Sequence, residues 1–196
     1  MFGAGYSSVA GFVGSIYVNE DNLLGKGQKV ATQLSLGGNQ NLVNIQFTEP
    51  SFMSSDVSAG IDIFGNETDL SENSGYKDKE IGAGLRFGFP LSDDLNLVTK
   101  YKYTNNEVYD VPANASTALT QLEGKRDISE FGYTLRYNTL DNMVWPTSGT
   151  LLDFSQDFAG LGGDVKYLRT EASGNYYMDL TSSLVGSISL NMGHIF

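Results

Sequence analysis

The sequence predicts an all-β fold, an antiparallel up-and-down meander of about eleven strands that forms part of a transmembrane outer-membrane β-barrel. Apolar and polar residues alternate with a period of two along most of the chain, and no comparable helical period occurs. The alternate positions are rich in Gly, Ser, Asn and Gln rather than in the Lys and Glu common on soluble surfaces. Apolar-face aromatic residues recur near the expected strand ends, as in an interfacial girdle: Phe89, Tyr101, Tyr103, Tyr137, Phe158 and Tyr176.

Five strands are expected in the first half of the chain, at 2–8, 11–19, 28–36, 41–49 and 57–65. The first contains two glycines, which weaken a strand. The fourth and fifth alternate most regularly. In the fifth, Val57, Ala59 and Ile61 point to one face, while Ser58 and Gly60 point to the other.

Six further strands are expected at 79–89, 94–105, 127–139, 149–158, 165–177 and 183–195. In the first of these, Ile81, Ala83 and Leu85 alternate with Gly82 and Gly84. The last strand ends on an aromatic residue and resembles the sorting signal of outer-membrane proteins, so it is either the native eleventh strand or an added or fortuitous signal.

The connections between these strands alternate in character, as expected for a meander whose turns lie at two opposite ends. One set is short: Asp21–Gly27, Pro50–Asp56, Pro90–Asp93, Leu140–Ser148 and Met178–Ser182. The other set includes two long polar loops, Asn66–Asp78 and Asn106–Arg126. Outer-membrane barrels show this asymmetry, with tight periplasmic turns and longer outside loops.

Composition excludes several classes of function. The 196 residues contain no cysteine and one histidine, His194, so thiol catalysis, Cys-based zinc sites and His-rich metal sites are excluded, and His194 has no triad-like neighbours in the sequence. A net charge of −11 argues against nucleic-acid binding, which needs a basic surface. The nearly apolar run Val9–Gly14 is far shorter than the ~20 residues of a spanning helix.

The place of the charged side chains depends on whether the apolar strand face is buried in protein or meets lipid. In a soluble β protein, the weaker alternative, the apolar face would be buried. In a membrane barrel it meets lipid, and the polar face lines a hydrated lumen. The charged residues expected to face that lumen are Asp62, Glu130, Asp153, Asp157, Glu171, Lys29, Arg86, Lys100, Lys102, Arg136 and Arg169. These charges nearly cancel, so most of the acidity belongs to loops and turns.

No motif points to catalysis or to a cofactor. A lumenal carboxylate pair could serve acid–base chemistry, but a network of opposite charges is the simpler interpretation. Acidic residues Glu67, Asp69 and Glu72 could bind calcium, yet they lack the EF-hand spacing. The glycine-rich segment Ala159–Asp164 is followed by neither a helix nor a Lys-Ser/Thr pair, so it does not predict a nucleotide site. We expect no enzymatic activity, metal or cofactor.

Several segments, in this order, resemble one family. They are Gly3–Ser8, Glu20–Gly27, Phe47–Phe52, Gly88–Pro90, Tyr137–Asp141, Trp145–Gly149 and Ala159–Asp164. Each segment alone is typical of a turn or a short strand, but their combined spacing is specific. Over nearly its whole length the chain resembles the barrel of the BamA family, outer-membrane-protein assembly factors of Gram-negative bacteria. The turn residues that carry the resemblance are Asn22, Leu23, Gly25, Gly27, Pro50, Phe52, Pro146, Gly149, Gly160, Gly162, Gly163 and Asp164.

The resemblance implies a function that no single site could show. It implies an outer-membrane protein that folds and inserts β-barrel clients through a lateral gate, where client strands add to an exposed strand edge. The implied partners are outer-membrane lipids, unfolded β-barrel clients and accessory assembly lipoproteins. The residues that match the gate strand are Phe2, Gly3, Ala4, Gly5, Tyr6, Ser7 and Ser8. A frayed first strand, a passive pore and a related translocation barrel of the same superfamily remain alternatives.

The resemblance covers only the first part of the family's barrel. Residues 1–196 are therefore expected to be the N-terminal portion of such a barrel, without the preceding POTRA domains, as an excised or engineered piece. Eleven antiparallel strands do not close in the usual way, because single-chain bacterial barrels have even strand numbers. The piece is expected to close differently or to pair with another copy through an edge strand.

Overall fold

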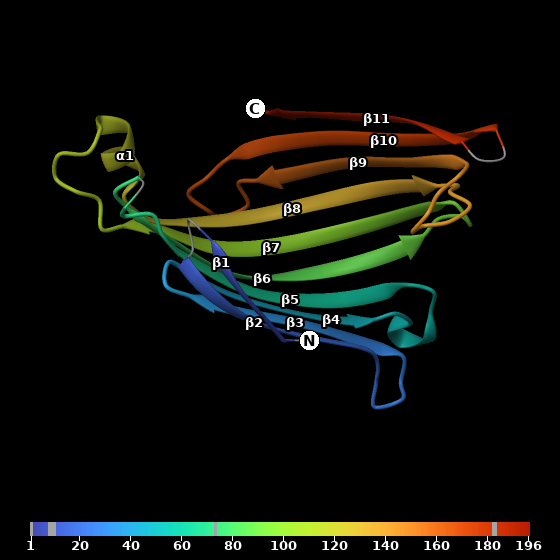
Figure 1. Cartoon of the computed structure of the whole chain (residues 1–196), viewed down its shortest axis with the longest axis horizontal. Helices are drawn as coiled ribbons and strands as arrows, with labels where there is room; N and C mark the ends of the chain where they lie inside the picture. Colours follow the sequence, from blue (N-terminus) through green and yellow to red (C-terminus); the bar gives the residue numbers. More distant parts are fainter. Residues whose placement is uncertain (1, 8–10, 73, 182–183) are drawn as a thin grey trace.

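The computed structural model describes residues 2–7, 11–72, 74–181 and 184–196. It forms one antiparallel sheet in which eleven strands follow each other in chain order (Figure 1), which confirms the predicted fold class. Ser8, expected in the first strand, lies outside the described residues. The strands are β1 (Phe2–Ser7), β2 (Gly11–Leu23), β3 (Gln28–Gly37), β4 (Gln40–Glu49), β5 (Ser58–Asp69), β6 (Lys77–Pro90), β7 (Leu95–Tyr109), β8 (Gly124–Asn138), β9 (Gly149–Ala159), β10 (Tyr167–Thr181) and β11 (Leu184–Ile195).

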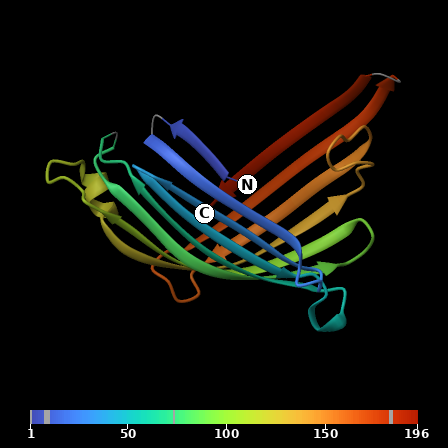
Figure 2. The same ribbon diagram turned by 60° about the horizontal axis from the view of Figure 1, so that its bottom comes forward.

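The sheet curves into a trough that is not closed. Figure 2 shows the first strand, in blue, and the last strand, in red, along the rims of this trough. Among the described residues, β1 pairs only with β2 and β11 pairs only with β10. Two strands therefore present unpaired backbone N–H and C=O groups along one side.

Several strands are longer than the sequence predicts. β2 continues past the expected end at residue 19 to Leu23, so Asn22 and Leu23 lie in a strand rather than in a turn. β7 continues to Tyr109, and β8 begins at Gly124. Backbone pairing persists here although the apolar–polar alternation fades, because polar residues at strand ends can face water on both sides.

Strand extension shortens the two predicted long loops. The loop expected at 66–78 becomes 70–76, and the one expected at 106–126 becomes 110–123. The second loop contains α1 (Thr117–Leu122), a helix that was not predicted, whose first turn is capped where the Ser116 hydroxyl accepts a bond from the backbone N–H of Leu119. Six residues are too few for a recognisable helical period.

The connections alternate between two ends of the sheet, but the predicted division into short and long sets is only partly correct. At the end that carries α1, the described connections are 38–39, the one that contains 70–72 and 74–76, 110–123 and 160–166. At the opposite end they are 24–27, 50–57, 91–94 and 139–148. The longest connection is thus at the α1 end, yet a two-residue turn is also there.

The apolar face is exposed and the polar face contains most of the buried groups. Among the described residues, the buried hydrophobic residues are Val108 and Ala159, whereas Thr104, Glu130 and Asp157 are buried polar ones. The apolar side chains point away from the trough and remain accessible, so the described residues form no conventional hydrophobic core. No helix in the described part of the chain is long and apolar enough to cross a membrane.

The outward face carries a row with three aromatic residues, in which the sequence predicted Phe158 correctly near a strand end but Tyr101 wrongly. Register aligns Tyr101, Phe131, Phe158 and Leu168 across β7 to β10. Tyr101 was expected near a strand end but lies in the middle of β7, because β7 extends to Tyr109. Strand length, rather than sequence position alone, therefore sets how far along the sheet each aromatic residue lies.

Candidate functional site

The inward face of the trough carries several charged side chains, five of which lie in one cross-strand row. Register places Lys29, Arg86, Lys100, Asp157 and Arg169 on one cross-strand line from β3 to β10. We call this line the charged row. Its members come from strands distant in sequence, and only the antiparallel register brings them together.

The charged row is most tightly paired where β7, β8, β9 and β10 meet. Lys100 Nζ lies 2.8 Å from Asp157 Oδ1, and Arg169 Nη2 lies 2.7 Å from Asp157 Oδ2. Glu130, from the adjacent row, lies 3.7 Å from Arg169 and 3.9 Å from Lys100, and accepts a hydrogen bond from the Tyr167 hydroxyl. Glu130 is 1% exposed and Asp157 is 2% exposed. Two buried carboxylates thus share two cations, which keeps both charges compensated.

Glycines in the charged row make room for these charges. A Cβ at Gly132 would lie 2.0 Å from Asp157 Oδ1 and 2.7 Å from Lys100 Cε. A Cβ at Gly60 would lie 2.8 Å from Arg86 Nη2. A larger residue at either position would displace the charged side chain that lies over it, so glycine leaves the space that the present arrangement of the network uses.

Two further ion pairs extend the inward network. The Arg86 guanidinium donates to Asp62 Oδ2 at 2.7 Å and to Thr48 Oγ1 at 3.0 Å. Arg136 donates to both carboxylate oxygens of Asp153, at 2.7 and 3.0 Å, in a more exposed position. These pairs involve four residues that the sequence placed on the lumenal face.

The remaining predicted lumenal residues lie at the margins of this network. The Lys102 ammonium lies 5.6 Å from the ring centre of Phe64, which covers Gly82. Lys29 and Glu171 are exposed and take part in none of the ion pairs found among the described residues. Tyr167 was not among the residues predicted to face the lumen. Its position two residues before Arg169 puts both side chains on the inward face of the strand, and this spacing was the signal that could have found it.

Two of the three acidic residues considered for calcium, Glu67 and Asp69, have other partners. Glu67 accepts a hydrogen bond from the Tyr109 hydroxyl at 2.6 Å, and Asp69 pairs with Lys77 at 3.5 Å. Lys77 also lies 3.1 Å from Asp110. Within the described ranges, no group of three or more Asp, Glu or His side chains could hold a metal ion.

The expected gate strand, β1, is weakly held. Phe2 is 83% exposed and Tyr6 is 81% exposed, and β1 contacts the sheet through β2 alone. A Cβ at Gly3 or Gly5 would meet no atom within 4 Å, so packing does not require glycine there. Glycines in a strand offer no side chain for cross-strand contacts, and β1 is paired on one side only.

The turn at 24–27 follows directly from its glycines. Gly25 and Gly27 both have φ of +73°, a conformation that favours glycine. The Asn22 side-chain carbonyl accepts a bond from the Gly27 backbone N–H at 2.7 Å. In the next turn at this end, Pro50 precedes Phe52, whose ring meets Phe87 edge-on with ring centres 6.2 Å apart.

The connection at 139–148 is organised by Asp141. Its carboxylate accepts bonds from the backbone N–H groups of Thr147 and Ser148, at 3.0 and 3.1 Å, and from the Thr147 hydroxyl at 2.9 Å. These bonds, that from Ser148 foremost, lower the pKa of Asp141 to about 2. Pro146 lies inside the closed turn, and Gly149 ends it with a φ of +107°.

The glycine-rich connection at 160–166 continues the sheet beyond the end of β9. The Gly160 N–H donates to the carbonyl of Ser129, and the Asp164 N–H donates to the carbonyl of Asp127, at 3.2 and 2.7 Å. The Asp164 carboxylate accepts the Asp127 N–H at 2.8 Å. A Cβ at Gly163 would lie 2.5 Å from the Asp127 carbonyl oxygen, so glycine lets the segment approach β8 closely. The segment thereby covers the backbone edge of β8 beyond the end of β9. Gly162 has a φ of +92°.

Comparison with protein families and known proteins agrees with this geometry. A model of the Omp85 superfamily domain matches residues 22–196. The chain is 31% identical over 196 residues to the outer membrane protein assembly factor BamA of Neorickettsia risticii, covering 98% of this chain and 26% of that protein. It is 25% identical over 179 residues to a SAM50-like protein of Drosophila melanogaster, covering 88% of this chain and 40% of that one.

A solved structure shows the same fold. The crystal structure of BamA from Haemophilus ducreyi lacking POTRA domains 1–3 is 25% identical and superposes with a TM-score of 0.75, covering 100% of this chain and 41% of that one. The chain spans about a quarter of the length of the BamA relatives it matches.

Proposed function

Because the chain belongs to the Omp85 superfamily, we propose that it is the N-terminal barrel segment of an outer-membrane insertase that folds and inserts β-barrel proteins. In this proposal β1 forms one side of a lateral gate. The observation that carries it is the position of β1 at the edge of a BamA-type sheet, where it pairs on one side only. A client strand would add to that edge by backbone hydrogen bonding, a known mode of peptide recognition.

The proposed location is the bacterial outer membrane, with the apolar outward face in lipid. The partners proposed are membrane lipids, unfolded β-barrel clients and accessory lipoproteins that act with the whole assembly protein. No enzymatic chemistry is proposed. The inward carboxylates Asp62, Asp153 and Asp157 each have a cationic partner within 2.8 Å, which supports a structural role for the charges.

The proposal is tested by photo-crosslinking from β1 in the whole assembly protein. Tyr6 is replaced by benzoyl-phenylalanine, a conservative aromatic change at an exposed position. The matched control carries the same group at Phe87 in β6, a strand that is paired on both sides. A radiolabelled client barrel protein is then folded into proteoliposomes that contain each variant.

Crosslinks to the client are expected from position 6 and should be several-fold weaker from position 87. Equal crosslinking from both positions would contradict the gate, since it would show no preference for the edge. Steady ion conductance without client crosslinks or accelerated client folding would indicate a passive pore instead.

A further inference from the structure

The outward face of β7 to β11 contains two consecutive apolar rows. Register aligns Leu95, Tyr137, Leu152, Gly174 and Leu190 in the first row. The second row aligns Leu97, Leu135, Phe154, Ala172 and Met192. Every member is large except the two from β10. Small side chains at successive outward positions of one strand therefore lie between large ones on both neighbouring strands.

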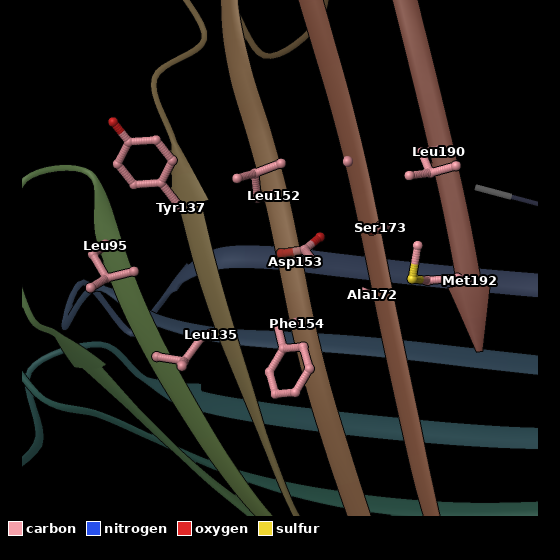
Figure 3. Close-up of a pocket in the computed structure, with 11 residues that line it drawn as sticks. Leu95, Leu135, Tyr137, Leu152, Asp153, Phe154, Ala172, Ser173, Leu190 and Met192 are labelled. Atoms are coloured by element: carbon pink, nitrogen blue, oxygen red, sulfur yellow. The ribbon is translucent and has the colours of Figure 1, made fainter. Parts of the chain in front are cut away.

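These rows form a groove that runs along β10. Ala172 and Gly174 are its floor, Leu152 and Phe154 on β9 form one wall, and Leu190 and Met192 on β11 form the other (Figure 3). Its volume of about 380 Å³ is at the lower end of the range for small-ligand pockets. We call this feature the β10 groove.

The walls of the β10 groove are supported from the sides. The ring of Phe154 packs against Tyr133, with ring centres 6.3 Å apart. A Cβ at Gly174 would lie 3.0 Å from Leu152 Cδ2, so the leucine leans over the glycine. The wall residue Met192 is unbranched and can adapt its shape to an occupant.

Different residues mark the two ends of the β10 groove. Toward the end opposite α1, the next outward residue on β10 is Tyr176, whose neighbours across the sheet are Thr150 and Ile188. Toward the α1 end, Gln156 donates to the Thr170 hydroxyl at 3.1 Å. An amphipathic tyrosine is typical of the headgroup level, and the Gln156–Thr170 hydrogen bond separates the β10 groove from the outward row of Phe131, Phe158 and Leu168.

We propose that the β10 groove binds one acyl chain of a phospholipid in an ordered position. The chain would enter beside Tyr176 and lie over Gly174 and Ala172. This occupant is favoured because the groove is continuous with the outward apolar face and because its lining offers almost no polar group to a protein partner. The inference goes beyond the proposed function and requires only that the outward face meets lipid.

The test uses a phosphatidylethanolamine that carries a diazirine in the middle of one acyl chain. The whole protein is reconstituted with this lipid and irradiated, and lipid adducts are mapped by mass spectrometry of peptides. Adducts on β9–β11 peptides are expected to exceed those on β5–β7 peptides several-fold. Uniform labelling of the outward face would overturn the proposal, because it would indicate ordinary lipid contact only.

Two variants make the test specific. Ala172→Leu fills the floor and is expected to reduce β9–β11 adducts several-fold. The matched control is Ala83→Leu, the same change on the outward face of β6 between Ile63 and Tyr103, which should leave these adducts unchanged. Met192→Ala removes a wall instead, so it tests the groove even where Ala172→Leu fails to fold.

The outcomes separate the alternative occupants. Equal loss of adducts in Ala172→Leu and Ala83→Leu would overturn the proposal. So would a change in oligomeric state of Ala172→Leu without a change in adducts, since a second copy of the chain would then be the occupant. Client crosslinking from Tyr6 is measured separately, so failure of this proposal is distinct from failure of the proposed gate.

Discussion

At the scale of single residues, glycine and aspartate have positional roles that composition does not reveal. Some of the 23 glycines lie against open space, whereas others have no room for a methyl group. Gly132 belongs to the second kind because it lies beneath the contact between Asp157 and Lys100. Asp141 likewise differs from the other turn carboxylates because three hydrogen bonds converge on it.

Gly132→Ala is expected to lower the free energy of unfolding by about 1–3 kcal/mol, since the added methyl group would overlap Asp157 and displace Lys100. Urea unfolding in detergent micelles, followed by the mobility shift of the folded barrel on gels, measures this loss. Gly65→Ala is the control, because the nearest atom to its Cβ is 3.9 Å away. An equal loss in both variants would contradict the proposed role of Gly132.

Asp141 is expected to hold the 139–148 turn down to strongly acidic pH. Its pKa is lowered to about 2, so its stabilising effect is complete above the ordinary carboxylate pKa and is lost as pH falls through 2. Trp145, the one tryptophan of the chain, lies in this turn and reports on it by fluorescence.

Wild-type emission should therefore stay constant down to a pH near the pKa of about 2 and then change. Asp141→Ala should already show at neutral pH the Trp145 emission that the wild type shows only at the acid extreme. Asp93→Ala, in the 91–94 turn, should behave as wild type. A transition of the wild-type emission at the ordinary aspartate pKa of about 4 would argue against this cap.

At the scale of strands, the inward face is held together by charges rather than by an apolar core. β9 illustrates this, because it carries one buried and one more accessible carboxylate on the same face. The Asp157 side chain is 3% exposed and contacts Lys100 and Arg169. The Asp153 side chain is 24% exposed, and its partner Arg136 is 50% exposed. Burial should therefore decide the energetic importance of each pair.

Asp157→Asn is expected to lower the free energy of unfolding by about 3–5 kcal/mol, because Lys100 and Arg169 lose a shared buried partner. Asp153→Asn should lower it by less than about 1 kcal/mol. Denaturant titrations of the two variants in the same detergent give both values. A larger loss in Asp153→Asn would show that burial does not set the strength of this network.

At the scale of the whole molecule, the open trough has two strand edges with unpaired backbone groups. β1 is six residues long, whereas β11 is twelve residues long and exposed along most of its length. Long exposed edges associate with other strands. The 196-residue chain by itself is therefore expected to pair through β11 with a second copy.

Single cysteines test this pairing cleanly, because the natural chain has none. Cysteine at one or more of Ser187, Ser189 and Asn191 in β11 should give disulfide-linked dimers on mild oxidation in micelles. Cysteine in place of Thr99, in the interior strand β7, should not. Equal and weak crosslinking at all four positions would argue against an edge-to-edge dimer.

The amino-acid sequence by itself determined the strand number, the meander order and the face on which the eleven predicted lumenal charges lie. All three follow from the period-two alternation and from the short connections between successive strands, which are local properties. The family resemblance rested on the same local segments, the turns near Gly25, Pro50, Pro146 and Gly163.

Only the tertiary structure decided which charges pair, which glycines are indispensable and where the β10 groove lies. Each of these depends on the register between strands far apart in sequence, as when β7, β8 and β9 bring Lys100, Gly132 and Asp157 onto one line. Alternation fixes the side of the sheet to which a residue points. It does not fix the residue's neighbours across the sheet, because these are set by backbone hydrogen bonding along whole strands.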